Sequence, residues 1–105
     1  MEQELPVELD PPEGIEDAKT AVEVLRAWIA DGALLVSLNS TAFGDNVEDW
    51  GRLLAEIGHH VAKAAALNGY MQESDAHAAL RKAFSSSFEV PTPNTSGKLK
   101  GQTKH

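Results

Sequence analysis

Two neighbouring histidines, His59 and His60, come closest in this sequence to a metal or acid–base site. Consecutive residues of a helix point about 100° apart, so the two imidazoles cannot easily chelate one ion. Only Glu56 and His60 have the four-residue spacing that places two ligands on one face, and a third would have to come from His77 or a loop carboxylate. The pair is better explained as boundary histidines of an exposed helix, and no metal site is predicted.

Sequence signatures of catalysis or cofactor binding are not found. The serines cluster at residues 85–87 and in loops, without the Gly-x-Ser-x-Gly elbow that exposes a nucleophile. The sequence has no Gly-x-Gly-x-x-Gly or Gly-x-x-x-x-Gly-Lys loop for a phosphate. Glu48 and Asp49 are consecutive, which is typical of a first helical turn rather than of an acid–base couple. We therefore expect no enzymatic activity, no catalytic residues and no cofactor.

The elements that must position any site begin with an amphipathic helix over about residues 46–68. Asp45 can cap its first turn, and Asn68-Gly69 can end it. Its large apolar side chains fall on one stripe: Val47, Trp50, Leu53, Leu54, Ile57 and Val61. One flank of this stripe carries small residues that let another backbone approach: Gly51, Gly58, Ala62 and Ala65. A second helix, capped by Ser74 and ending near residue 84 or 86, is expected to lie against the first.

A β-hairpin is predicted before the helices, because Asp31-Gly32 tolerates positive φ and favours a tight turn between strands over residues 22–30 and 33–39. Pairing Ala30 with Ala33 sets the register. One face of the hairpin is then wholly apolar and should meet the helices; it carries Leu25, Ala27, Ile29, Leu34, Val36 and Leu38. The far face carries Val24, Trp28 and Leu35.

A rival interpretation makes residues 15–30 a helix that ends at Gly32, since Ile15, Val22 and Ile29 recur at helical spacing. The hairpin is favoured because Val24, Trp28 and Ile29 suit strands and residues 34–38 otherwise lack a partner. Residues 16–21 are expected to form a short helix first. The predicted fold class is α+β in the order ββαα.

The formal net charge of −7 is distributed unevenly along the 105 residues. We expect an acidic disordered tail at 1–14, a single domain at 15–90 and a basic disordered tail at 91–105. The acidic balance argues against nucleic acid as a partner. With no cysteine, no secretory signal and no apolar run long enough to span a membrane, the sequence indicates a cytoplasmic protein without a membrane partner.

Several short segments together are similar to a known family. They are Arg26-Ala27-Trp28-Ile29, Asp31-Gly32, Val36-Ser37-Leu38, Trp50-Gly51, Leu53-Leu54-Ala55 and His60-Val61-Ala62. Over about residues 15–93 the chain resembles a domain-of-unknown-function family of short alphaproteobacterial proteins. The resemblance implies a small cytoplasmic bacterial protein with no established activity, catalytic residue or cofactor, so no functional residue is carried over.

The pattern favours a small non-enzymatic, homo-oligomeric interaction or regulatory module. The predicted hairpin has no third layer over its far face, so Trp28 and Leu35 are expected to be uncovered, and a homodimer interface is predicted at Val24, Trp28 and Leu35. The alternative is a small-molecule binder with a cleft between helices and sheet lined by Trp50, His60 or Tyr70. An enzyme with an unrecognised site is a third, less favoured class.

Overall fold

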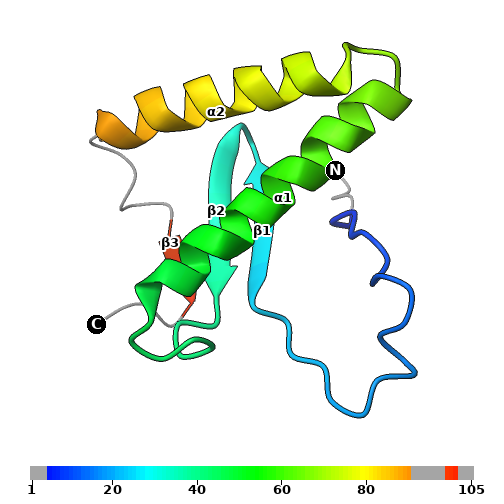
Figure 1. Cartoon of the computed structure of the whole chain (residues 1–105). Coiled ribbons are helices and arrows are strands. Elements are labelled where there is room, and N and C mark those ends of the chain that lie inside the picture. The colour runs from blue at the N-terminus through cyan, green and yellow to red at the C-terminus, as the bar shows by residue number, and fades with distance from the viewer. Residues whose placement is uncertain (1–4, 91–98, 102–105) are drawn as a thin grey trace.

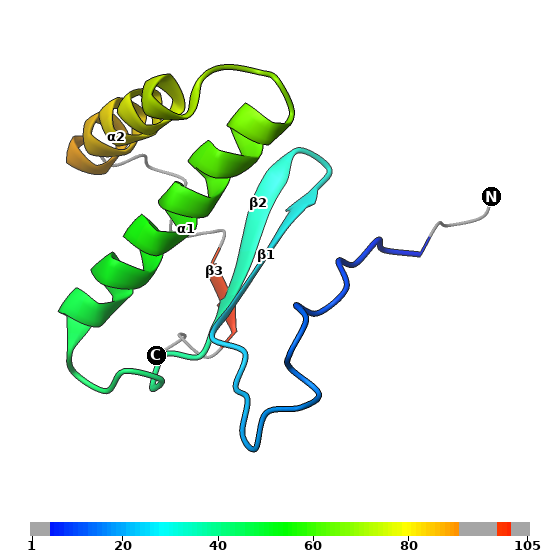
Figure 2. The ribbon, with the colours of Figure 1, turned by 45° about the vertical axis from the view of Figure 1, so that its right-hand side comes forward.

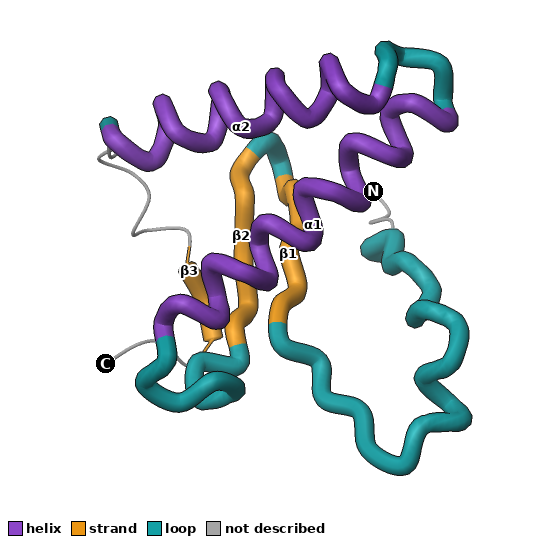
Figure 3. Tube along the Cα trace, in the orientation of Figure 1, coloured by secondary structure: helices purple, strands orange, loops and turns teal. Residues whose placement is uncertain are grey.

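The computed structural model describes residues 5–90 and 99–101 of the chain (Figure 1). The elements follow one another as β1 (Leu25–Ala30), β2 (Ala33–Leu38), α1 (Val47–Leu67), α2 (Glu73–Glu89) and β3 (Leu99–Gly101). The α+β class and the ββαα order are confirmed. The rival helix over residues 15–30 is wrong, and residues 16–21 contain a turn rather than a short helix (Figure 3).

The hairpin turn is the local feature that sets the sheet. Asp31 and Gly32 have φ angles of 53° and 80°, in the left-handed region that a two-residue hairpin loop needs. The antiparallel register follows, with Ala30 opposite Ala33 and Trp28 opposite Leu35, as predicted. The turn overrides the helical spacing of the residues before it, because strands paired across it satisfy their backbone groups and share an apolar face.

The predicted helices exist, but neither predicted N-terminal cap is used. The residue before α1 is Asn46, whose side chain caps no backbone amide of the first turn and instead donates to the Asp49 carboxylate at 2.9 Å. Helix α2 begins at Glu73, one residue before the predicted cap Ser74. Acidic residues in the first turns of both helices stabilise the positive ends of the helix dipoles, and each helix begins without a side-chain cap.

The end of α1 agrees with the sequence prediction. Gly69 has a φ of 76°, and the Asn68 side chain donates a hydrogen bond to the Ala64 carbonyl at 3.0 Å. The Tyr70 amide also donates to the Ala65 carbonyl at 2.9 Å. These bonds satisfy carbonyls that the helix end would leave unpaired, and they turn the chain into α2.

Helices α1 and α2 pack against each other, as expected, and then diverge away from the connecting turn (Figure 1). Ala62 and Ala76 are 1% and 4% exposed, and they are the buried residues of the part of the chain that the structure describes. Small side chains therefore do allow a close approach. Gly51 and Gly58 do not contribute to it, because a Cβ on either would meet no atom within 4 Å.

Helix α1 crosses one face of the sheet (Figures 1 and 2). Arg26, on the same sheet face as Trp28 and Leu35, bonds to Glu8 in the N-terminal segment, which runs on the side of the sheet away from α1 (Figure 2). The predicted apolar face therefore points toward α1. It is not sealed, since Ile29 is 73% exposed and Leu54 of the α1 stripe is 42% exposed.

The third strand was not predicted. β3 pairs parallel to β2, with Leu99 opposite Val36, so the sheet order is β1-β2-β3. This strand lies within the segment predicted to be a basic disordered tail. Residues 1–4, 91–98 and 102–105 lie outside the described residues, and the flexibility of both tails stays a prediction.

Two glycine-to-alanine substitutions, one in the hairpin turn and one in α1, test the role of the turn. Gly32→Ala should lower the free energy of unfolding by about 1–2 kcal/mol, because a Cβ is strained at positive φ. Gly51→Ala in α1 should raise it by up to about 1 kcal/mol, since the new methyl meets nothing and the helix propensity improves. Urea unfolding of both variants measures the two signs, and a Gly32→Ala variant as stable as the wild type would contradict this account of the turn.

The helix contact generates a second test. Ala76→Leu should cost about 1–3 kcal/mol of unfolding free energy, because the larger side chain has no room beside Ala62. Ala79→Leu, on the same helix but exposed, is the control and should change stability by less than about 0.5 kcal/mol. Equal urea midpoints for the two variants would show that Ala76 is not packed against α1.

Candidate functional site

The three residues predicted to line a ligand cleft do not come together. Trp50 lies in the first turn of α1, where its ring contacts Phe43 edge to face with centroids 5.0 Å apart. Tyr70 follows the other end of α1 and is 77% exposed, and His60 is exposed between them. A helix rises about 1.5 Å per residue, so the ends of α1 are too far apart to share one small ligand. The three residues therefore do not line one small cleft together, and a ligand site at any one of them stays a prediction.

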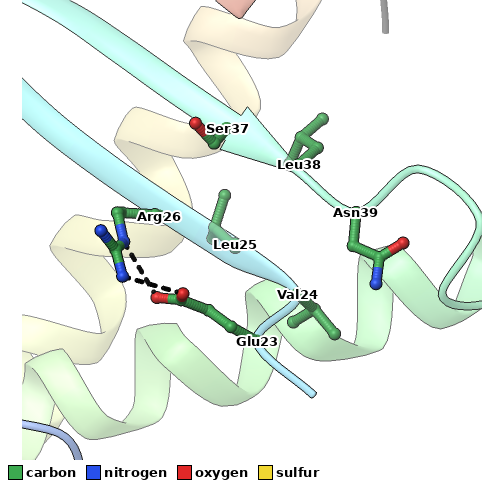
Figure 4. A pocket seen from close by; sticks show the side chains of 7 residues that line it. All are labelled: Glu23, Val24, Leu25, Arg26, Ser37, Leu38 and Asn39. Carbon is green, nitrogen blue, oxygen red and sulfur yellow. Dashed lines mark hydrogen bonds and ion pairs between the residues drawn. The ribbon is translucent and has the colours of Figure 1, made fainter. Parts of the chain in front are cut away.

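A hollow of about 420 Å³ lies instead at the open end of the hairpin (Figure 4). Its lining comes from the start of β1 and the end of β2: Glu23, Val24, Leu25, Arg26, Ser37, Leu38 and Asn39. The Asn39 amide donates to the Val24 carbonyl at 3.0 Å and continues the ladder beyond the strands. The hollow is thus held by backbone pairing and combines apolar walls with one charged cluster.

Arg26 dominates the electrostatics of this hollow. Its Nε and Nη2 donate to the two carboxylate oxygens of Glu23 at 3.1 and 3.0 Å, a two-bond geometry that Figure 4 shows. Its Nη1 reaches Glu8 at 3.3 Å. The hydrogen bonds and charge of Glu23, with a smaller contribution from Glu8, raise the pKa of Arg26 above its ordinary value. The guanidinium is consequently paired with carboxylates of its own chain.

A histidine pair is the feature that sequence reasoning missed. The rings of His59 on α1 and His77 on α2 stack with centroids 4.9 Å apart and planes 28° apart. His59 lies three residues before Ala62, and His77 lies one residue after Ala76, so both lie beside the helix contact. This spacing from the small residues is the sequence signal that could have predicted the pair. Stacked rings turn their faces rather than their lone pairs toward each other, so the pair is arranged for packing rather than chelation.

A second hollow, of about 610 Å³, lies along the first half of α2. Its lining is Glu73, Ser74, His77, Ala78 and Arg81. Within the described ranges no three His, Asp or Glu side chains gather closely enough to hold a metal ion. The hollow therefore offers one acid, one imidazole and one guanidinium along a single helix face.

The residues predicted for a dimer interface do share one surface. Val24, Trp28 and Leu35 lie on the sheet face directed away from α1, with Trp28 directly opposite Leu35. All three are half-buried rather than uncovered as predicted. The N-terminal segment reaches this face through the Glu8–Arg26 ion pair, so the face is less open than that of a bare hairpin.

No helix in the described part of the chain has the length and apolar character needed to cross a membrane. Among curated proteins no relative matches the sequence. A solved structure described as that of "a putative pyruvate dehydrogenase from the photosynthetic bacterium Rhodopseudomonas palustrus CGA009" is similar, with 33% sequence identity and a TM-score of 0.67. The similarity covers 84% of this chain and 88% of that one.

The family comparison covers most of the described fold. Residues 8–92 match the family model "Domain of unknown function (DUF5076)", which spans the hairpin, both helices and the Glu8 contact to Arg26. The resemblance to a domain-of-unknown-function family is thereby confirmed. The chain belongs to the DUF5076 family.

Proposed function

We propose that this domain is a non-enzymatic interaction module that works as a homodimer. The observation that carries the proposal is the lack of a core within one copy. Ala62 and Ala76 are the buried residues of the described ranges, whereas large apolar side chains of the sheet and of α1 are exposed, Ile29 and Leu54 among them. Exposed apolar surface of this extent is typical of proteins that bury it against a partner.

A second copy is the partner that the fold supports. The hairpin is a two-stranded ribbon extended by the short β3, and small ribbons are weakly stable alone. Its far face presents Val24, Trp28 and Leu35 without a helix over them. Phe88, in the last turn of α2, and Val90, just after the helix, are themselves exposed, so they do not cover this face. A symmetric dimer that extends the sheet would bring the same patch of both copies together.

Ligand binding and catalysis are not favoured by the two hollows. The guanidinium of Arg26 already binds Glu23 and Glu8, so it is not free to attract an anionic substrate. The name of the Rhodopseudomonas protein points to pyruvate oxidation, but none of the side-chain groups described above supports that chemistry for this chain. We also propose a bacterial, cytoplasmic origin, supported by the acidic charge and by the bacterial source of that relative.

The proposal predicts the sedimentation behaviour of two matched variants. The wild type should sediment as a dimer at micromolar concentration. Trp28→Glu should sediment as a folded monomer, because the interface would desolvate a carboxylate at a position that an apolar indole now occupies. Leu67→Glu, which places the same charge on an exposed residue at the far end of α1, should remain a dimer.

Circular dichroism of both variants shows whether each stays folded. A wild type that sediments as a monomer at every concentration would overturn the proposed function. A Trp28→Glu variant that is dimeric like Leu67→Glu would overturn the placement of the interface at Trp28.

A further inference from the structure

We propose that two copies join through the free edge of β1, with the strands antiparallel about a two-fold axis at Ala27, so that both sheets become one. This inference rests on the proposed function and names its interface. β1 is an edge strand, since the sheet order is β1-β2-β3 and β1 pairs with β2 alone among the described elements.

The hydrogen-bond pattern of the hairpin shows which backbone groups are free. In an antiparallel pair, alternate residues direct their N–H and C=O groups toward the neighbouring strand. A two-residue turn makes Ala30 and Ala33 such a pair, and the bond from the Asn39 amide to the Val24 carbonyl continues this alternation. Residues 24, 26, 28 and 30 therefore bond inward. Leu25, Ala27 and Ile29 direct their backbone groups outward from the sheet.

This edge lacks the devices that keep edge strands apart. Natural proteins protect such strands with lysine or other charged residues, with proline, with a bulge, or with a helix or loop that covers the edge. Among the described residues no other backbone segment hydrogen-bonds to this edge. The segment Leu25–Ala30 contains no lysine or proline, and its register with β2 runs without a bulge. Its one charge, on Arg26, is held by Glu23 and Glu8. The edge is therefore ready to accept a strand.

The edge is complementary to itself in one register. With Ala27 opposite the partner's Ala27, Leu25 lies opposite the partner's Ile29, so the residues with outward backbone groups pair with one another and form about six ladder hydrogen bonds. The side chains of Leu25, Ala27 and Ile29 share the apolar face in both copies. This pairing would cover Ile29, which is 73% exposed in one copy.

The other face fits the same register. Arg26 lies opposite the partner's Trp28, where a guanidinium over an indole ring is attractive, and within Leu25–Ala30 no like charges are opposed. Because directly opposed residues point to the same side of a sheet, the two-fold axis stands perpendicular to it, and both α1 helices lie on one side. The far faces, with Trp28 and Leu35, become one continuous surface.

A single cysteine tests this register in a chain that has no cysteine of its own. In Ala27→Cys the two Cα atoms would be about 5.5 Å apart, within the range that a disulfide spans. In Ala30→Cys, on the same strand and equally exposed, they would be about 20 Å apart. Mild oxidation of the full-length protein should cross-link most of Ala27→Cys, and Ala30→Cys should stay largely uncross-linked on a non-reducing gel.

Ala27→Pro provides an independent measurement, because it removes an outward N–H without removing a bond to β2. It should sediment as a monomer, and Ala27→Ser, which keeps the N–H, as a dimer. If the wild type is a dimer but Ala27→Cys cross-links no more than Ala30→Cys, the edge register is wrong and the dimer stands. A monomeric wild type would overturn both proposals.

Discussion

The structure depends on how the apolar face of the hairpin and the apolar stripe of α1 are kept from water. Each element makes one such face, and the chain places them on the same side of the sheet. Contact between the helices is close, with Ala62 and Ala76 buried, whereas Leu54 of α1 and Ile29 of β1 remain exposed. Two buried alanines remove little apolar surface, and a domain of this size has little stability to spare. The backbone arrangement is thus well specified, but a single copy leaves part of its apolar surface exposed.

Sequence patterns predicted most of the fold because local chemistry specifies it. Asp31-Gly32 dictates a two-residue turn, and the turn fixes every pair of the register. The apolar period and Asn68-Gly69 define α1 to within about one residue at each end. The caps at Asp45 and Ser74 were wrong, because several neighbouring polar residues could begin each helix and the acidic first turns need no side-chain cap. β3 depends on a long-range parallel pairing, which leaves no local signal in the sequence.

The candidate sites were harder to predict than the fold. Trp50, His60 and Tyr70 have residue types that suit a binding cleft, but their distances depend on the length of α1, which keeps them apart. The stacking of His59 on His77 depends on the angle and offset of two helices, which no period reveals. Val24, Trp28 and Leu35 were placed on one face correctly because strand alternation and register are enough for that. How far that face is covered depends on the chain segments around it, which strand register does not specify.

In the proposed dimer the second copy covers apolar surface that a single folded copy leaves exposed, so stability and assembly should be linked. Such a dimer becomes more stable as its concentration rises, by mass action. Urea unfolding at protein concentrations spread over a hundredfold range measures this link directly. The account predicts that the midpoint rises steadily with concentration. A midpoint that is the same at every concentration would contradict this link, because it would show that association adds nothing to the stability of a single copy.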